Sequence, residues 1–102
     1  MFNASTITAP QTTNTFPRHI SIQRLPDVIA KSGQSRSTIY ARIDQKLWTH
    51  PVPLGPRMVG WPSYEVDALI FARIAGKSDD EIRALVLELE AARKTCGVKE
   101  EA

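Results

Sequence analysis

Several features that would point to a membrane or an oxidising compartment are missing from this chain of 102 residues. No apolar run approaches the roughly 20 residues that a membrane-spanning helix needs. No positively charged residue precedes Arg18, and no apolar block stands before it, so we expect no secretory signal. The single cysteine, Cys96, cannot form an internal disulfide, which suits a reducing cytoplasm. We therefore expect a cytoplasmic protein with one small domain.

Residue patterns for catalysis or metal binding are also missing. His19 and His50 stand far apart in the sequence, without a cysteine or acidic cluster at the spacing of zinc ligands. The chain contains no glycine-rich phosphate loop, no nucleophile elbow and no pair of catalytic carboxylates. The acidic run of residues 79–81 is accounted for by the electrostatics of a helix start. We expect no enzymatic activity, no metal and no cofactor.

What the chain does have is an uneven distribution of charge. The net charge is +2. Residues 18–61 include seven basic and two acidic side chains, whereas residues 62–102 include six basic and nine acidic ones. A basic half favours a polyanionic partner, although a merely solvated surface could carry the same charges.

Two short helices are predicted in the basic half. Pro26 suits the first turn of one helix, and Gly33 suits its left-handed end. Ser35 is a typical N-cap for the next helix. Ile39 and Ile43 stand four residues apart and should share its buried face. The short connection between the two helices predicts a helix-turn-helix arrangement.

A proline-rich stretch follows and excludes a regular helix over residues 47–63. Its segments PVPL and RMVGW read as two short extended pieces around the turn LGPR. We expect a small hairpin, with Trp48 and Trp61 packed against the helices. Arg57 lies at or beside the turn, where it could reach DNA or serve only the solubility of the turn.

Two more helices are predicted in the acidic half. Ser63 should cap the first of them and Gly76 should end it, with an inward stripe that includes Ile74. Ser78 and Glu81 form a capping box for the second, which we expect to stop at Gly97. The expected fold is mainly α with a small β-hairpin wing, a winged helix-turn-helix followed by an additional C-terminal amphipathic helix. Its expected segments are a flexible tail over 1–18, the winged helix-turn-helix over 19–76, the C-terminal helix over 77–96 and a flexible tail over 97–102.

The predicted second helix carries the candidate DNA-reading residues, because its apolar pair leaves the polar side chains on other faces. At the start of a helix in the major groove, Arg36 can fork onto guanine, Ser37 can reach a base or a phosphate, and Tyr40 can reach a phosphate or a thymine methyl group. The residues expected at the DNA backbone or in the wing are Thr38, Arg42, Lys46 and Arg57. Exposed polar residues on a small helical bundle are the alternative interpretation of this pattern.

Three motifs, SRSTIY, PVPLGPRMVGW and EVDALIFARIA, occur in a familiar order and spacing. With the residues around them, over 22–75, the chain resembles the AlpA-type phage regulators, small MerR-like and excisionase-like winged helix-turn-helix proteins of prophages and mobile elements. The resemblance implies binding to double-stranded DNA, with the helix of Arg36, Ser37 and Tyr40 as reader and the wing around residues 55–57 beside it. It also implies a role in expressing or excising a mobile element, at the bacterial nucleoid.

Three functions stay open at this level: a transcriptional regulator, an excisionase with the same DNA contacts, or an adaptor or antirepressor that acts through the C-terminal helix. The apolar stripe of that helix could close the core or contact a partner, and we favour the second. Its residues are Ile82, Leu85, Val86 and Leu89. The partners expected besides DNA are a second copy of the chain, as a homodimer or a cooperative oligomer on DNA, and a recombinase or another phage protein.

Overall fold

The computed structural model describes residues 20–95. The predicted tails and the expected helix stop at Gly97 lie outside these residues. No helix in this range is long and apolar enough to cross a membrane. In chain order the elements are β1 (Ile22–Gln23), α2 (Leu25–Ser32), α3 (Arg36–Asp44), β2 (Val52–Gly55), β3 (Met58–Pro62), α4 (Ser63–Ile74), α5 (Asp79–Ala92) and the 3-10 turn η1 (Arg93–Thr95).

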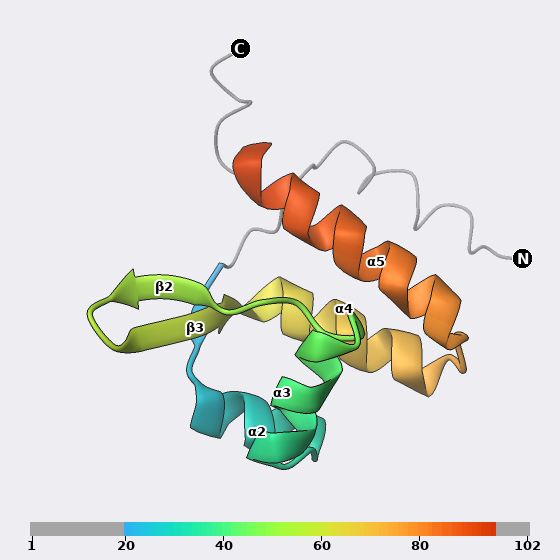
Figure 1. Ribbon diagram of the computed structural model, residues 1–102, viewed down its shortest axis with the longest axis horizontal. Coiled ribbons are helices and arrows are strands. Elements are labelled where there is room, and N and C mark those ends of the chain that lie inside the picture. The colour runs from blue at the N-terminus through green and yellow to red at the C-terminus, as the bar shows by residue number, and fades with distance from the viewer. Residues whose placement is uncertain (1–19, 96–102) are drawn as a thin grey trace, which may run out of the picture.

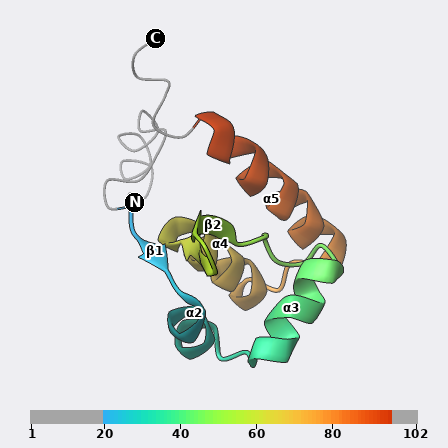
Figure 2. The same ribbon diagram turned by 60° about the vertical axis from the view of Figure 1, so that its left-hand side comes forward.

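Helix α4 lies at the centre, with α2 on one side of it and α5 on the other (Figure 1, Figure 2). The hairpin β2–β3, which we call the wing, projects from the helices with its turn at the far end (Figure 1). The fold is mainly helical with a small antiparallel sheet, which confirms the predicted winged helix-turn-helix with an additional C-terminal helix.

The helix-turn-helix forms as its sequence predicts. Gly33 has φ 75°, and its N–H donates to the carbonyl of Ile29 at 3.0 Å, which ends α2. The hydroxyl of Ser35 accepts from the N–H of Thr38 at 3.1 Å and so caps α3. Ile39 and Ile43 lie in the core, as expected.

The sheet has a third strand that the sequence did not predict. β1 pairs with β3 on the side opposite to β2, so the strand order is β1-β3-β2. β1 has two residues, too few for an alternating pattern to reveal. Gly60 allows this pairing, because a Cβ there would overlap the side chain of Ile22 and lie 3.1 Å from the carbonyl oxygen of Gln23.

The core gathers side chains from all the major helices and from the strand β3. Trp48 and Trp61 are almost fully buried, as predicted, and the indole N–H of Trp61 donates to the carbonyl of Thr49 at 2.9 Å. The buried apolar residues are Val28, Ile39, Ile43, Leu47, Trp48, Trp61, Val66, Leu69, Ala72, Ile82 and Val86.

Two expectations about α4 are wrong. Ser63 does not cap the helix; Pro62 holds that position, and the Ser63 hydroxyl accepts from the backbone N–H of Ser21 at 3.3 Å. Ile74 is 74% exposed, because the buried apolar residues of α4 recur every three positions, at Val66, Leu69 and Ala72, and Ile74 lies outside this series. Gly76 follows the helix with φ 77°, as predicted.

Helix α5 belongs to the core of the domain. Its capping box is as predicted: the N–H of Ser78 donates to Glu81 Oε1 at 2.8 Å, and this bond lowers the pKa of Glu81. Ile82 and Val86 are 1% and 3% exposed, so the prediction that they contact a partner is wrong. The sequence pattern shows only that a stripe is apolar, and here it covers the core. Leu85 and Leu89 are partly buried against the same core.

A buried ion pair fixes the far end of α5. Glu65 is fully buried, and Arg93 donates to its two carboxylate oxygens at 2.6 and 2.8 Å. The same guanidinium donates to the carbonyl of His50 at 2.7 Å. Glu90 accepts from the backbone N–H of His50 at 2.7 Å and lies 3.0 Å from its ring Nδ1. We call these four residues the clasp; it joins α4 and α5 to the base of the wing.

Candidate nucleic-acid interface

The exposed face of α3 follows from the position of its two core residues. Successive helical residues are rotated by about 100°, so the direction opposite Ile39 and Ile43 falls near Ser37 and Ala41. Both are exposed. Ala41 was not among the predicted site residues, although counting one turn from Ser37 would have found it. Its short side chain would let the helix backbone approach a partner closely.

Tyr40 lies to one side of this face, and Arg36, one turn earlier at the start of α3, contacts its ring. The guanidinium of Arg36 lies 5.6 Å from the centroid of the Tyr40 ring, a cation–π geometry. Both side chains are exposed, Tyr40 at 36%. The ring therefore restricts the orientation of the predicted base-reading arginine.

Three hydroxyl groups gather at the first turn of α3. The hydroxyl of Ser35 donates to Thr38 Oγ1 at 2.9 Å and lies 3.4 Å from Ser37 Oγ. Since Ser35 also caps the helix, its polar groups are occupied by α3 itself. Ser37 is exposed, whereas Thr38 is half-buried.

The wing presents Arg57 in a strained conformation. Arg57 is exposed at the turn between β2 and β3, and its φ of 60° lies in the left-handed region that favours glycine. For a residue with a side chain this conformation costs about 1–2 kcal/mol. A second arginine, which the sequence did not single out, lies against the wing: Arg24 Nε donates to the carbonyl of Val59 at 2.9 Å.

Lys46 holds the same conformation just beyond the end of α3. Its φ is 66°, its N–H donates to the carbonyl of Ile43 at 3.0 Å, and its side chain is exposed. Among residues 20–95, positive φ at a residue other than glycine occurs only at Lys46 and Arg57. Both are basic and both were predicted to contact the DNA backbone. Backbone strain of this kind is concentrated at functional sites in proteins.

Arg42 does not join these residues. Its guanidinium Nη1 donates to Gln34 Oε1 at 2.7 Å, and its side chain lines a cavity on the flank of α3. Burial lowers the pKa of Arg42, and the charge of Arg73 lowers it further. The Arg42 side chain lies on another side of α3 than Ser37 and Ala41, and its role at the DNA backbone stays a prediction.

Residues 21–74 match the family model described as the prophage CP4-57 regulatory protein, AlpA. This chain belongs to the AlpA family. It is also similar to the uncharacterized protein ORF88 of Enterobacteria phage P4, with 43% identity over 54 residues, which are 53% of this chain and 61% of that protein. The chain thus spans less than two thirds of the length of that relative. No solved structure matches.

The description of the matched family names a prophage regulatory protein. Helices α2, α3 and α4, together with the wing, lie inside the matched range. Helix α5 lies outside it, although its side chains complete the same core. In the range that the structure describes, no group of three or more His, Cys, Asp or Glu residues could hold a metal ion.

Some of the described cations of this AlpA-family chain form ion pairs and others do not. In α4, α5 and η1, carboxylates pair with Arg73 at 3.6 Å, with Arg83 at 3.3 Å and with Arg93 at 2.6 Å. Within the described part of the chain no ion pair involves Arg36 or Lys46, nor does one involve the arginine at the wing turn. Arg36, Lys46 and Arg57 are thus three of the described cations without an ion pair. The others are Arg24, Arg42, Lys77 and Lys94.

Proposed function

We propose that this chain binds specific sites on double-stranded DNA and regulates transcription of a phage or another mobile element in the bacterial cytoplasm. Helix α3 enters the major groove, and the wing lies beside it. The observation that carries the proposal is the position of three exposed cations without ion pairs in residues 20–95, Arg36 and Lys46 at the two ends of α3 and Arg57 at the wing turn. Cations without ion pairs at an exposed helix attract a polyanionic partner such as DNA.

The contacts divide into those that read bases and those that hold the backbone. Arg36, Ser37 and Tyr40 reach base edges from the first turns of α3. The outermost residue, Ala41, allows a close approach. Lys46 and Arg57 contact phosphates on either side of the groove and supply attraction that does not depend on sequence.

Binding to the promoter and the attachment-site DNA of the element that encodes the chain is the direct test. We expect Arg36→Ala to weaken binding to the specific site by about 1–3 kcal/mol and to leave binding to scrambled DNA nearly unchanged. Lys94→Ala is the matched control, because it removes an exposed positive charge from η1, outside the proposed DNA face. If the two variants weaken all DNA equally, Arg36 does not read a base. Absence of DNA binding even at low salt would refute the function.

A second candidate, contact with another protein, is favoured by one observation on α4. Phe71 and Ile74 stand three residues apart and are 67% and 74% exposed. This apolar pair, rather than the buried Ile82 and Val86, is available to a second copy on DNA or to a recombinase. Phe71→Asp should abolish self-association or capture of the recombinase by a folded chain, and sedimentation with and without DNA measures it.

A further inference from the structure

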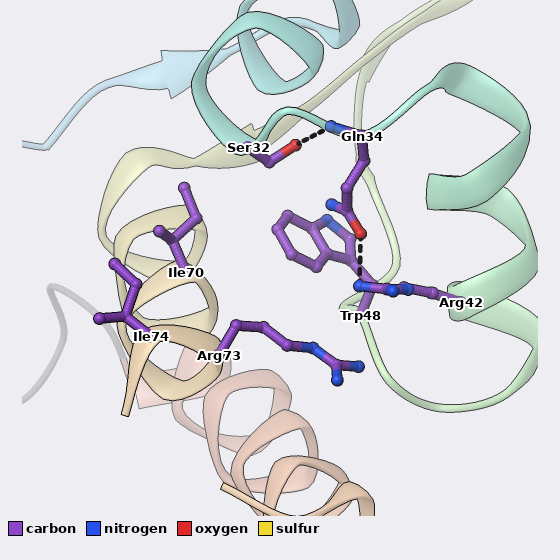
Figure 3. Close-up of a pocket in the computed structure, with 7 residues that line it drawn as sticks. All are labelled: Ser32, Gln34, Arg42, Trp48, Ile70, Arg73 and Ile74. Atoms are coloured by element: carbon purple, nitrogen blue, oxygen red, sulfur yellow. Dashed lines mark hydrogen bonds between the residues drawn. The ribbon is translucent and has the colours of Figure 1, made fainter. Parts of the chain in front are cut away.

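A cavity of about 270 Å³ lies between the α2–α3 turn and α4 (Figure 3). Arg42 of α3 and Arg73 of α4 approach it from opposite sides, and Gln34 lies above the space between them. The apolar part of the wall is formed by Trp48, Ile70 and Ile74.

No carboxylate of residues 20–95 lines the cavity beside these two guanidinium groups. Arg73 pairs with Asp79 at 3.6 Å, but that carboxylate is 58% exposed and does not line the cavity. Arg42 has only the neutral amide oxygen of Gln34 as a hydrogen-bond partner. Burial and the charge of Arg73 lower the pKa of Arg42, whereas the charge of Asp79 raises it. An anion that contacts both guanidinium groups would add to the effect of Asp79.

Two further polar groups of the wall are donors without a partner in the described part of the chain, whereas the Ser32 hydroxyl accepts from the N–H of Gln34 at 3.3 Å. Within residues 20–95, neither Trp48 Nε1 nor Gln34 Nε2 has a hydrogen-bond partner, although both atoms are buried. Trp48 as a whole is 2% exposed. The acceptor oxygen of Gln34 is already used by Arg42. An indole N–H and an amide NH₂ can only donate, so each unsatisfied polar group here requires an acceptor.

We propose that this cavity binds a small organic anion, whose carboxylate or phosphate group lies between Arg42 and Arg73 and whose apolar part packs on Trp48, Ile70 and Ile74. The volume of about 270 Å³ lies just below the range of roughly 300–1,000 Å³ that is usual for small-molecule sites, so the ligand should be small. Paired guanidinium groups are the usual receptors for such oxyanions, and apolar walls with a few convergent polar groups are typical of ligand sites.

A ligand in the cavity should influence α3, because two polar residues that line the cavity lie in that helix or just before it. Arg42 belongs to α3, and Gln34 directly precedes the cap residue Ser35. A ligand that holds both fixes the α2–α3 turn and so the start of α3. This regulatory consequence rests on the proposed DNA-binding function, whereas binding of the anion itself does not.

Benzoate is a suitable probe, with benzyl alcohol as the neutral control and inorganic phosphate as the anion without an apolar part. In ¹H–¹⁵N spectra of the full chain without DNA, millimolar benzoate should shift the indole N–H signal of Trp48. The indole N–H of Trp61 is an internal reference, because it is bonded to Thr49 at a separate place in the core. Benzyl alcohol should cause no such shift, and inorganic phosphate should bind at least about tenfold more weakly than benzoate.

Arg42→Gln and Arg73→Gln should each weaken benzoate binding by about tenfold or more, while Lys77→Gln, which removes an exposed charge nearby, should leave it unchanged. An unshifted Trp61 signal shows that each variant is folded. The proposal is overturned if benzoate gives no shift, or if benzyl alcohol shifts the Trp48 signal equally. It is also overturned if inorganic phosphate binds as tightly as benzoate and random-sequence duplex DNA displaces both, since the site would then hold a DNA phosphate. If the parent chain binds benzoate but does not bind DNA in a separate titration, the proposed DNA-binding function is refuted and the anion site is not.

Discussion

Replacing Arg93 by methionine should destabilise the domain far more than the loss of one surface ion pair. Glu65 is fully buried, and both of its carboxylate oxygens accept from Arg93. The variant keeps most of the apolar stem of the side chain but leaves a carboxylate in the core without its cation. Removing one partner of a buried pair typically costs about 3–5 kcal/mol. That is a large part of the roughly 5–15 kcal/mol that stabilises a small domain.

Lys31→Met is the matched control, because Lys31 and Asp67 are joined by an ion pair of the same length, 2.6 Å. These side chains are 40% and 46% exposed, compared with 23% for Arg93 and 0% for Glu65. Exposed pairs contribute about 0–1 kcal/mol. Burial, and not the distance between the atoms, should therefore separate the two variants.

Urea unfolding followed by tryptophan fluorescence measures the difference, since Trp48 and Trp61 are buried in the folded chain. Arg93→Met should lower the midpoint by roughly 2 M, and Lys31→Met by less than about 0.5 M. The double variant Glu65→Leu with Arg93→Met should recover most of the loss, because it removes the buried charge together with its partner. Equal losses for Arg93→Met and Lys31→Met would refute the reasoning.

Three further variants test other parts of the structure. Gly60→Ala should lower the free energy of unfolding by about 1–3 kcal/mol, because its Cβ overlaps Ile22, and adding Ile22→Ala should recover part of this loss in the same urea assay. Arg57→Gly should leave the stability in thermal melts unchanged or raise it by up to about 1 kcal/mol, because glycine adopts the φ of 60° without strain. The same variant should bind DNA more weakly. A clear loss of stability would contradict the assigned strain. Burial opposes ionisation of Glu90, but its hydrogen bonds with His50 outweigh that effect and hold the pKa of Glu90 below the ordinary 4.5. A lowered pKa adds stability that is present above the ordinary value and lost as pH falls through the folded one, so Glu90→Gln should be less stable than the parent at about pH 7 and nearly equal to it at about pH 3.

The sequence predicts the local elements of this fold well, because local chemistry determines them. Gly33 and Ser35 end one helix and begin the next through bonds to residues three or four positions away, and the capping box at Ser78 works in the same way. The burial of Ile39 and Ile43 follows from their helical spacing. These signals are complete within one or two turns of chain, so no knowledge of distant contacts is needed.

What the sequence could not predict depends on distant partners. Glu65 has the appearance of an acidic residue at a helix start, and only the return of α5 shows that it is a buried member of the clasp. Likewise, Arg42 has the pattern of a backbone-contacting residue, but its position depends on Gln34 and on the nearby Arg73. The apolar stripe of α5 can pack on the core only if the other helices leave part of the core uncovered. The spacing of apolar residues along α5 carries no information about that.

The contacts of α5 show how a helix outside the family match can serve the proposed DNA-binding surface. The segment 45–50 connects α3 to the wing, and α5 holds it at both ends. Arg83 Nε donates to the carbonyl of Gln45 at 3.0 Å, and Arg93 donates to that of His50 at 2.7 Å. The proposed function requires α3 and the wing to meet DNA in a fixed relative orientation, and a helix that holds their connection reduces the conformational entropy lost on binding. Under that proposal, α5 and η1 contribute to recognition by positioning the two elements.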